Sequence, residues 1–361
     1  MIDVAARYRG LRVLVTGHTG FKGAWLASWL KRDGAIVAGI ALPPERERPN
    51  LFEVADVAQG MHSTLGDIRD YATVRQCFAE FRPDVVFHLA AQALVRRSYV
   101  DPVGTFASNV MGTVHVLEAA RCHPGVRAIV AVTTDKVYEN REWTWGYREN
   151  DRLGGKDAYS ASKAAAELAA AAYRDRLLPL AGDVAVATAR GGNVIGGGDW
   201  SEDRLVPDAV MALLSGADLT LRNPTAVRPW QHVLELCRGY LQLGALLLDS
   251  PAAAIGAWNF GPERDNEVEV GKLVADFFGA WGPAKSRVRV EGSNLKEAGQ
   301  LRLDHSRARH GLGWQPMLGY AETLSWTADW YRRYHVSGES AGALVDAQIE
   351  RYVQLCPSSS T

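Results

Sequence analysis

The chain has 361 residues, and 47% of them are hydrophobic, enough to fill the core of one large α/β domain with an appendage or of two domains. Its 40 Lys and Arg residues balance 41 Asp and Glu residues, which leaves a formal net charge of −1. A chain without excess positive charge lacks the electrostatic basis for binding nucleic acid. Nucleic acid is therefore not an expected partner.

No segment is typical of a secreted or membrane protein. Residues 1–10 carry no apolar signal region, and no stretch approaches the roughly 20 apolar residues that span a bilayer. The cysteines are scattered and form no C-x-x-C pair, which predicts neither a disulfide framework nor a zinc site (Cys77, Cys122, Cys237, Cys356). We expect a soluble cytoplasmic protein without a bound metal.

The first half alternates short apolar runs with helical patterns, as βαβ units do. The expected strands are Leu11–Thr16, Ala35–Leu42, a strand ending near Leu65, Val85–Leu89, Arg127–Val132 and Val184–Ala189. The expected helices are Phe21–Asp33, Tyr71–Phe81, Asn109–Arg121 and Ala158–Leu178. This order predicts an α/β fold with a Rossmann-like, doubly wound parallel sheet and a smaller C-terminal substrate-binding lobe.

The pattern loosens after Arg190 into Gly- and Pro-rich stretches and shorter helices, which are typical of a binding lobe. We therefore expect a dinucleotide-binding domain over residues 1–189 and a second lobe over 190–356. The helix expected over 233–248 is predicted to return to the first domain. Residues 357–361 are expected to form a frayed tail.

A glycine-rich turn follows the first expected strand, in the order Gly17-His18-Thr19-Gly20-Phe21-Lys22-Gly23. Gly17 permits a tight turn, Gly20 lets the backbone approach a pyrophosphate, and Gly23 allows close packing of helix and strand. An ordinary strand-to-helix turn is the alternative interpretation. The position after the first strand of a βαβ unit favours a dinucleotide site formed by these seven residues.

The end of the second expected strand lacks the acidic residue that usually holds the adenosine ribose, because Ala41-Leu42-Pro43-Pro44 stand there. Glu45 is a substitute for that acid, whereas Arg46 or Arg48 would favour a 2′-phosphate, so this segment leaves NAD and NADP open.

Two further strand ends are candidates for contact with the cofactor. Asp67, with Ile68, lies where a carboxylate can meet the adenine, although a polar strand end is an equal alternative. Leu89, Ala90 and Ala91 leave room for the nicotinamide or its ribose, with simple core packing as the alternative.

Tyr159 and Lys163 are one helical turn apart, so the phenol and the ammonium lie on one face of a helix. A cation held there lowers the pKa of the Tyr and makes the phenolate a base for a sugar hydroxyl. Thr134, Asp135 and Lys136 follow another strand at the carboxyl edge of the sheet, where α/β proteins bind ligands. A surface ion pair and a polar turn are the respective alternatives.

Together these residues resemble the extended short-chain dehydrogenase/reductase family, from about Leu11 to Pro316. Segments 134–143, 146–149, 190–200 and 228–233 resemble its CDP-glucose 4,6-dehydratase branch. The resemblance implies an NAD-dependent, redox-neutral conversion of CDP-glucose to CDP-4-keto-6-deoxyglucose. It assigns Thr134, Tyr159 and Lys163 to the catalytic triad, Asp135 to the acid, and Lys136 to either a base at C5 or a stabiliser of the enolate.

The family pattern also implies residues that bind the diphosphate and sugar: Asn193, Arg204, Arg228, Asn259 and Arg302. Arg190 is interpreted as structural, and the aromatic residues Trp143, Trp145 and Tyr147 either cover the sugar, stack on a base or anchor their loop.

The alternative functions are those of another nucleotide-sugar dehydratase, a 4-epimerase and a non-catalytic nucleotide-binding module. Small residues on the helices over 109–121 and 158–173 predict a homodimer.

Overall fold

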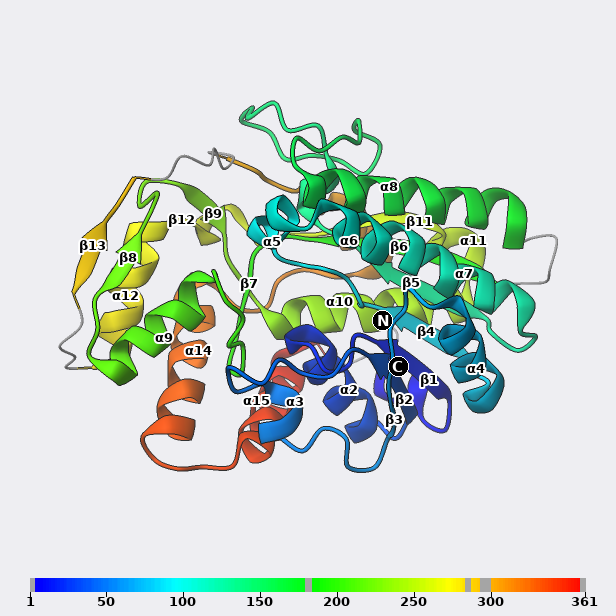
Figure 1. The fold of residues 1–361 in the computed structure, drawn as a ribbon, viewed down its shortest axis with the longest axis horizontal. Coiled ribbons are helices and arrows are strands. Elements are labelled where there is room, and N and C mark those ends of the chain that lie inside the picture. Colours follow the sequence, from blue (N-terminus) through cyan, green and yellow to red (C-terminus); the bar gives the residue numbers. More distant parts are fainter. Residues whose placement is uncertain (1–3, 179–183, 283–286, 293–299, 358–361) are drawn as a thin grey trace.

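The protein is described by a computed structural model over residues 4–178, 184–282, 287–292 and 300–357 (Figure 1). Its centre is a sheet of seven strands in the order β11-β6-β5-β4-β1-β2-β3, and every neighbouring pair is parallel. The strands are β1 (Arg12–Thr16), β2 (Ile36–Ala41), β3 (His62–Leu65), β4 (Val85–His88), β5 (Ala128–Val132), β6 (Ala185–Gly191) and β11 (Gly256–Phe260). This sheet confirms the predicted Rossmann-like, doubly wound fold.

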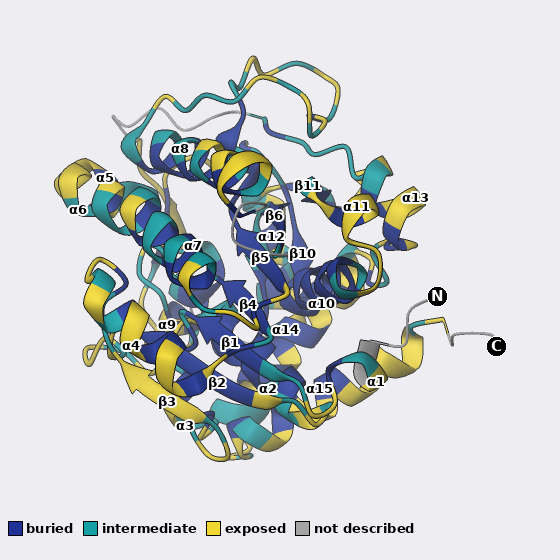
Figure 2. Ribbon diagram, turned by 90° about the vertical axis from the view of Figure 1, so that its right-hand side faces the viewer, coloured by how far each residue is buried: buried dark blue, intermediate teal, exposed yellow. Residues whose placement is uncertain are grey.

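Helices cover both faces of the sheet, which explains why its strands are continuous apolar runs. One face carries α1 (Val4–Tyr8), α2 (Phe21–Arg32), α10 (Val233–Asp249) and α15 (Ala341–Leu355). The other carries α4 (Tyr71–Phe81), α7 (Gly112–Cys122) and α8 (Ala158–Ala172). Strands β4 and β5 are buried throughout, whereas the edge strand β3 is exposed (Figure 2).

Two predicted helices change their winding within their length. The helix expected over 109–121 begins in a π-helical turn, η1 (Ala107–Met111), and continues as α7. The helix expected over 158–178 ends in a second π-helical turn, η3 (Tyr173–Leu177). The sequence pattern cannot show such turns, because a π-turn shifts the spacing of the hydrophobic residues in an α-helix by only one residue.

Residues beyond 190 contribute to the central sheet as well as to a second lobe. Helix α10 packs against β5 and β6, and β11, which we did not predict, extends the sheet beyond β6. The small strands β8 (Leu219–Leu221), β12 (Glu267–Glu269) and β13 (Val288–Val290) lie away from the sheet with α9 (Leu205–Ser215) and α12 (Val270–Trp281) (Figure 1). The division of the chain at residue 190 thus stays a prediction. Strand β11 belongs to the central sheet although its residues lie in the range predicted for the second lobe.

The remaining elements connect these layers. They are α3 (Leu51–Val54), α5 (Val95–Val100), α6 (Pro102–Phe106), η2 (Asp135–Val137), β7 (Val194–Ile195), β9 (Val227–Pro229), β10 (Gln231–His232), α11 (Pro251–Ala254), η5 (Arg264–Asn266), α13 (Ser306–Leu312) and α14 (Tyr320–His335). No helix in the described ranges has the length and apolar character of a membrane span. Most of the predicted tail, residues 358–361, lies outside the described residues.

Candidate active site

The turn after β1 is shaped by its glycines. Gly17 has a φ of +78°, in the left-handed region that favours glycine, and a Cβ on it would lie 2.7 Å from the Ala90 nitrogen. A Cβ on Gly23 would overlap with the carbonyl oxygen of Gly17. The strand order reverses between β1 and β4, which is where doubly wound sheets bind ligands. The glycines therefore bring bare backbone into this crevice.

Helix α2 begins at Phe21 directly in this turn. Its N-cap residue, Gly20, provides no side-chain oxygen for the first N–H groups of the helix. These groups and the positive end of the helix dipole favour an anion at this point. The Thr19 hydroxyl donates to the Leu42 carbonyl at 2.9 Å and so fixes the turn to the end of β2. The turn fits the pyrophosphate of a dinucleotide.

His18 lies under the turn rather than in the crevice. Its ring is fully buried, its Nε2 is 2.8 Å from the Ser63 hydroxyl, and it packs edge-on against Phe52. Burial lowers the pKa of His18 to about 4, so the ring is neutral. A Cβ on Gly39 would overlap with this ring. The ring thus packs between β2 and β3, and the predicted contact of His18 with the cofactor stays a prediction that concerns its backbone in the turn.

Two of the three candidates after β2 for the adenosine ribose or a 2′-phosphate are held in ion pairs, and the third, Arg46, is exposed. Glu45 pairs with Arg97 at 2.6 Å, and Arg48 pairs with Asp208 at 3.5 Å. These ion pairs are exposed and of low energy, so either side chain can exchange its partner for a ligand. The choice between ribose and 2′-phosphate at this point stays open on geometry alone.

Asp67 and Ile68 follow β3 with different surroundings. The Asp67 carboxylate accepts from the backbone and side chain of Arg69, both at 2.8 Å. Ile68 is buried against α7, where a Cβ on Gly112 would overlap with its side chain. The side chain of Ile68 thus contributes packing, and the predicted contact of both residues with the adenine stays a prediction.

The loop after β4 is held against β1. The backbone nitrogens of Leu89 and Ala90 donate to the carbonyl and hydroxyl oxygens of Thr16, each at 3.1 Å. His88 supports the same hydroxyl with its Nδ1 at 2.7 Å. Residues 89–91 are half-buried, and the backbone of Leu89 and Ala90 lies against Gly17, so their predicted contact with the nicotinamide or its ribose stays a prediction.

The predicted catalytic groups meet at the ends of β5 and α8. The Thr134 hydroxyl donates to Asp135 at 2.9 Å, and Lys136 Nζ donates to the same carboxylate oxygen at 3.3 Å. A hydrogen bond also joins Thr134 to Tyr159. Lys163 Nζ donates to the Val132 carbonyl at 2.9 Å. The structure therefore brings together all five residues that the sequence assigned to catalysis.

The charges in this cluster depend on one another. Burial raises the pKa of Tyr159, while Lys136, the hydrogen bond with Thr134, and Arg204 oppose that rise. The supporting role that the sequence assigns to Lys163 stays a prediction, and the structure adds Lys136 and Arg204 as cations that favour the phenolate of Tyr159. Burial also acts against the charge of Lys136, yet Asp135 and Tyr159 outweigh it and raise the pKa of Lys136 above its ordinary value. Lys136 is therefore charged.

Lys22 joins this cluster from the first turn of α2. Burial, together with Arg204, lowers the pKa of Lys22 to about 8. Burial and the charge of Lys22 in turn lower the pKa of Lys163 to about 7. The glycine-rich motif assigns Lys22 only to the cofactor, and nothing in its local sequence shows that its ammonium faces the catalytic residues.

Two of the five predicted substrate residues, Arg204 and Arg228, lie beside the catalytic cluster, and a third, Asn193, follows Gly192, which lies against the Asp135 carboxylate. Arg204 is near Tyr159 and Lys22 and pairs with the buried Asp199 at 3.4 Å. Arg228, on β9, is close enough to Lys136 to oppose its charge. Asn193 is half-buried just before β7. Arg204 and Arg228 therefore place positive charge beside the catalytic cluster, and guanidinium groups suit phosphate oxygens.

The other two, Asn259 and Arg302, bind protein groups instead. Asn259 is fully buried: its Oδ1 accepts from Tyr138 at 2.7 Å, and its Nδ2 donates to the carbonyls of Tyr147 and Asp304. Arg302 forms an ion pair with Glu267 at 2.5 Å. Their predicted contact with substrate stays a prediction, and in this structure both side chains are held by protein groups.

The aromatic residues after β5 mainly anchor their loop. Tyr147 stacks on Tyr138 and on Trp143, with 5.1 Å between the ring centroids in both pairs. The Tyr147 hydroxyl accepts from the backbone nitrogen of Arg141 at 2.6 Å. Trp145 is 66% exposed and remains available to a ligand. Of the alternatives set out for these residues, anchoring fits Trp143 and Tyr147.

A comparison with known proteins identifies the family. Residues 14–327 match the family model described as GDP-mannose 4,6 dehydratase. The chain belongs to this family. The predicted resemblance to nucleotide-sugar enzymes of the extended short-chain dehydrogenase/reductase fold is thereby confirmed.

Individual members of the family show how near the relatives are. The CDP-glucose 4,6-dehydratase of Salmonella typhimurium is 44% identical over 350 residues, 96% of this chain and 97% of the relative. The UDP-glucose 4-epimerase of Mycolicibacterium smegmatis is 30% identical over 89% of this chain and 99% of its own. The dTDP-glucose 4,6-dehydratase of Streptomyces venezuelae, solved with NAD bound, matches with a TM-score of 0.78 and 25% identity over 91% of this chain and 98% of that one. These relatives share the fold but differ in activity, so the site residues must distinguish them.

Proposed function

We propose that the chain is a CDP-glucose 4,6-dehydratase that uses NAD. The observation that carries the proposal is the contact of Asp135 and Lys136 with Thr134 and Tyr159, which adds an acid and a cation to the triad of a sugar oxidoreductase. The 44% identity to the Salmonella dehydratase over nearly the whole chain supports CDP as the nucleotide. NAD, bound by residues 17–23, would accept the hydride from C4 and later return it to C6.

Tyr159 is the base for the C4 hydroxyl. Its phenol is buried, which disfavours the phenolate and raises its pKa, and Lys136, Arg204 and the hydrogen bond with Thr134 oppose this rise in part. Thr134 also orients the hydroxyl of the sugar, because its own oxygen is fixed by Asp135. Lys163, held by the Val132 carbonyl, is directed to the nicotinamide ribose in our proposal.

Asp135 and Lys136 serve the elimination of water. Oxidation at C4 acidifies the C5 proton, and the ionised Asp135 takes this proton and returns it to the departing C6 hydroxyl, which leaves as water. The raised pKa of Lys136 favours its second proposed role, in which a charged ammonium stabilises the enolate, over that of a neutral base at C5. Arg204 and Arg228, with Asn193, bind the diphosphate.

The experiment that tests this proposal is a panel of substrates. CDP-, dTDP-, GDP- and UDP-glucose are supplied to the purified protein with NAD, and the 4-keto product is measured for each. We expect the highest kcat/KM with CDP-glucose. Preference for another nucleotide would identify a different dehydratase. A product that keeps its C4 hydroxyl in inverted configuration would identify a 4-epimerase. Binding without any turnover would support the non-catalytic alternative.

We further propose that two copies of the chain associate through the face formed by α5, α6, η1 and α8. These elements pack against one another and expose large apolar side chains: Tyr99, Val100, Val103, Met111 and Leu168. Val100 and Val103 are 86% and 79% exposed, and apolar groups gathered in this way are typical of an interface. Light scattering of Leu168→Lys should show a monomer where the parent chain is a dimer. The matched control is Val353→Lys, at an exposed valine on α15.

A further inference from the structure

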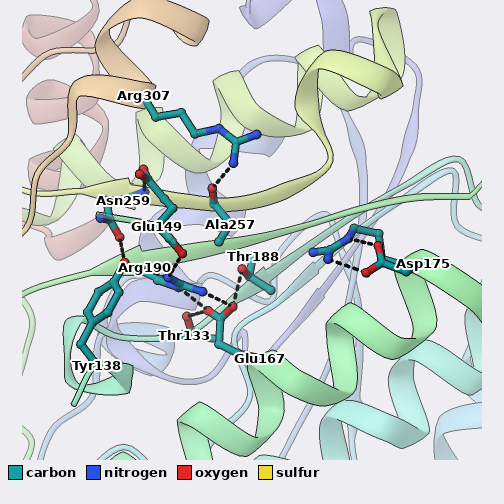
Figure 3. Close-up of polar contacts among 11 residues, drawn as sticks. Thr133, Tyr138, Glu149, Glu167, Asp175, Thr188, Arg190, Ala257, Asn259 and Arg307 are labelled. Atoms are coloured by element: carbon teal, nitrogen blue, oxygen red, sulfur yellow. Dashed lines mark hydrogen bonds and ion pairs between the residues drawn. The ribbon is translucent and has the colours of Figure 1, made fainter. Parts of the chain in front are cut away.

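A buried ion pair joins Glu167 to Arg190, and Figure 3 shows it with its hydrogen-bond partners. Glu167 on α8 and Arg190 on β6 are 4% and 3% exposed. Arg190 Nε and Nη2 donate to the two carboxylate oxygens, each at 2.9 Å. The hydroxyls of Thr133 and Thr188 donate to the same oxygens at 2.5 Å and 2.7 Å. Both oxygens of the carboxylate thus accept two hydrogen bonds, and burial does not prevent these partners from lowering the pKa of Glu167.

The position of Glu167 on its helix connects this pair to catalysis. Tyr159, Lys163 and Glu167 follow one another at intervals of one turn and therefore lie along one face of α8. Lys163 bonds to the Val132 carbonyl, and Glu167 bonds to the hydroxyl of Thr133. The helix is thereby fixed at two successive residues of the segment that ends in Thr134.

The other half of the guanidinium extends the network toward the second lobe. Arg190 Nη1 donates to the Tyr138 hydroxyl at 2.8 Å and to the Glu149 carbonyl at 3.0 Å. Tyr138 donates in turn to Asn259 on β11. The carboxylate of Glu149 accepts from the Asn259 backbone nitrogen at 2.9 Å. A single set of directional bonds therefore joins α8, β5, β6 and β11.

The fold does not need a charged pair at this place for stability alone. Taking two charges out of water costs free energy, and replacement of such a pair by apolar side chains of similar volume is often neutral or stabilising. What an apolar pair cannot provide is direction, because it fixes no register between a helix and a strand. The directional bonds of the Glu167–Arg190 pair therefore point to a role in geometry.

We propose that Glu167 is a positioning residue. Together with Arg190 and Thr133 it fixes the position of α8 along its axis relative to the end of β5. This position determines how Tyr159 approaches Thr134 and the substrate. This inference rests on the proposed dehydratase activity. It assigns no chemical step to Glu167, whose carboxylate is enclosed by protein groups.

Two matched single variants separate positioning from stability. Thr133→Val and Thr188→Val each remove one hydroxyl from the Glu167 carboxylate at a buried site, but only Thr133 adjoins Thr134. We expect kcat to fall roughly tenfold in Thr133→Val, with KM within about twofold of the parent value, because a small displacement of reacting groups is costly. Thr188→Val should lose a similar amount of thermal stability and keep kcat within about twofold. Equal kcat in both variants and the parent, or losses of kcat that follow the losses of stability, would overturn the proposal.

The double variant Glu167→Leu/Arg190→Met provides the second test. It should fold with a thermal midpoint close to that of the parent and lose kcat by about 10- to 100-fold. A folded double variant with the kcat of the parent contradicts the proposal, and so does a variant that cannot fold, since the pair is then a requirement of the fold itself. Absence of 4-keto product in the parent protein under the same conditions would instead reject the proposed function.

Discussion

The turn after β1 and the cluster after β5 lie at the same edge of the sheet but are built from different chemistry. The turn presents backbone N–H groups and owes its shape to Gly17, Gly20 and Gly23, where a side chain would fill the space. The cluster presents side chains whose protonation states depend on one another, as in the effect of Asp135 on Lys136. The first kind of site is specified by neighbours in the sequence, and the second by charges that the fold brings together.

The largest effect is expected in the cluster, for Tyr159→Phe. The change removes the group that accepts the C4 proton and keeps the ring, so turnover should fall by about 10³-fold with the fold intact. Steady-state assays and circular dichroism of the purified variant measure both quantities. Turnover close to that of the parent protein would remove Tyr159 from its role.

Lys136→Met should reduce the elimination by about 10²-fold and the first hydride transfer by less, because the charge is required after C4 is oxidised. Reduced cofactor should then accumulate on the enzyme, and its absorbance measures this. Lys136→Arg keeps the charge and is expected to retain more activity than Lys136→Met. Two equally inactive variants would favour a neutral lysine acting as the base.

On the side of the turn, a pair of glycine variants separates folding from cofactor binding. Gly23→Ala places a methyl group on the carbonyl oxygen of Gly17 and should lower the free energy of unfolding by about 2 kcal/mol. Gly20 has a φ of −80°, and a Cβ there lies at an ordinary 3.4 Å from the same oxygen. Gly20→Ala should therefore keep the stability of the cofactor-free protein and weaken only NAD binding. Denaturant titration and calorimetric binding measure the two effects, and a destabilised Gly20→Ala protein would contradict this account.

The smallest effect concerns Lys22, which belongs to both regions. The positive charge of Lys22 disfavours the charged form of Lys163, so Lys22→Met should raise the pKa of Lys163 from about 7 toward its ordinary value. NMR titration of isotope-labelled lysine side chains in the cofactor-free protein measures this shift. Lys272→Met, at an exposed lysine paired with Asp276, is the control and should leave Lys163 unchanged. An unchanged pKa in both variants would place Lys22 too far from Lys163 to matter.

The contrast between the two regions also explains what could be predicted from the sequence. Local patterns identify the glycine-rich turn and the one-turn spacing of Tyr159 and Lys163, because both are set by residues close in the chain. They do not show that Lys136 and Arg204 act on Tyr159 or that His18 is packing, because these depend on contacts across the fold. Glu167 is an intermediate case: its spacing from Lys163 was a usable signal, but its partner Arg190 lies on another strand.

The most direct test of the central claim follows one deuterium atom. With CDP-glucose deuterated at C4, the account predicts a product that has lost one water and carries the deuterium at C6 of the same molecule, since the transfer is internal and closed to solvent. Mass spectrometry and NMR of the product locate the label. Deuterium back at C4 without loss of water, or deuterium released in free reduced cofactor, would contradict the assignment of Asp135 and Lys136 to an elimination.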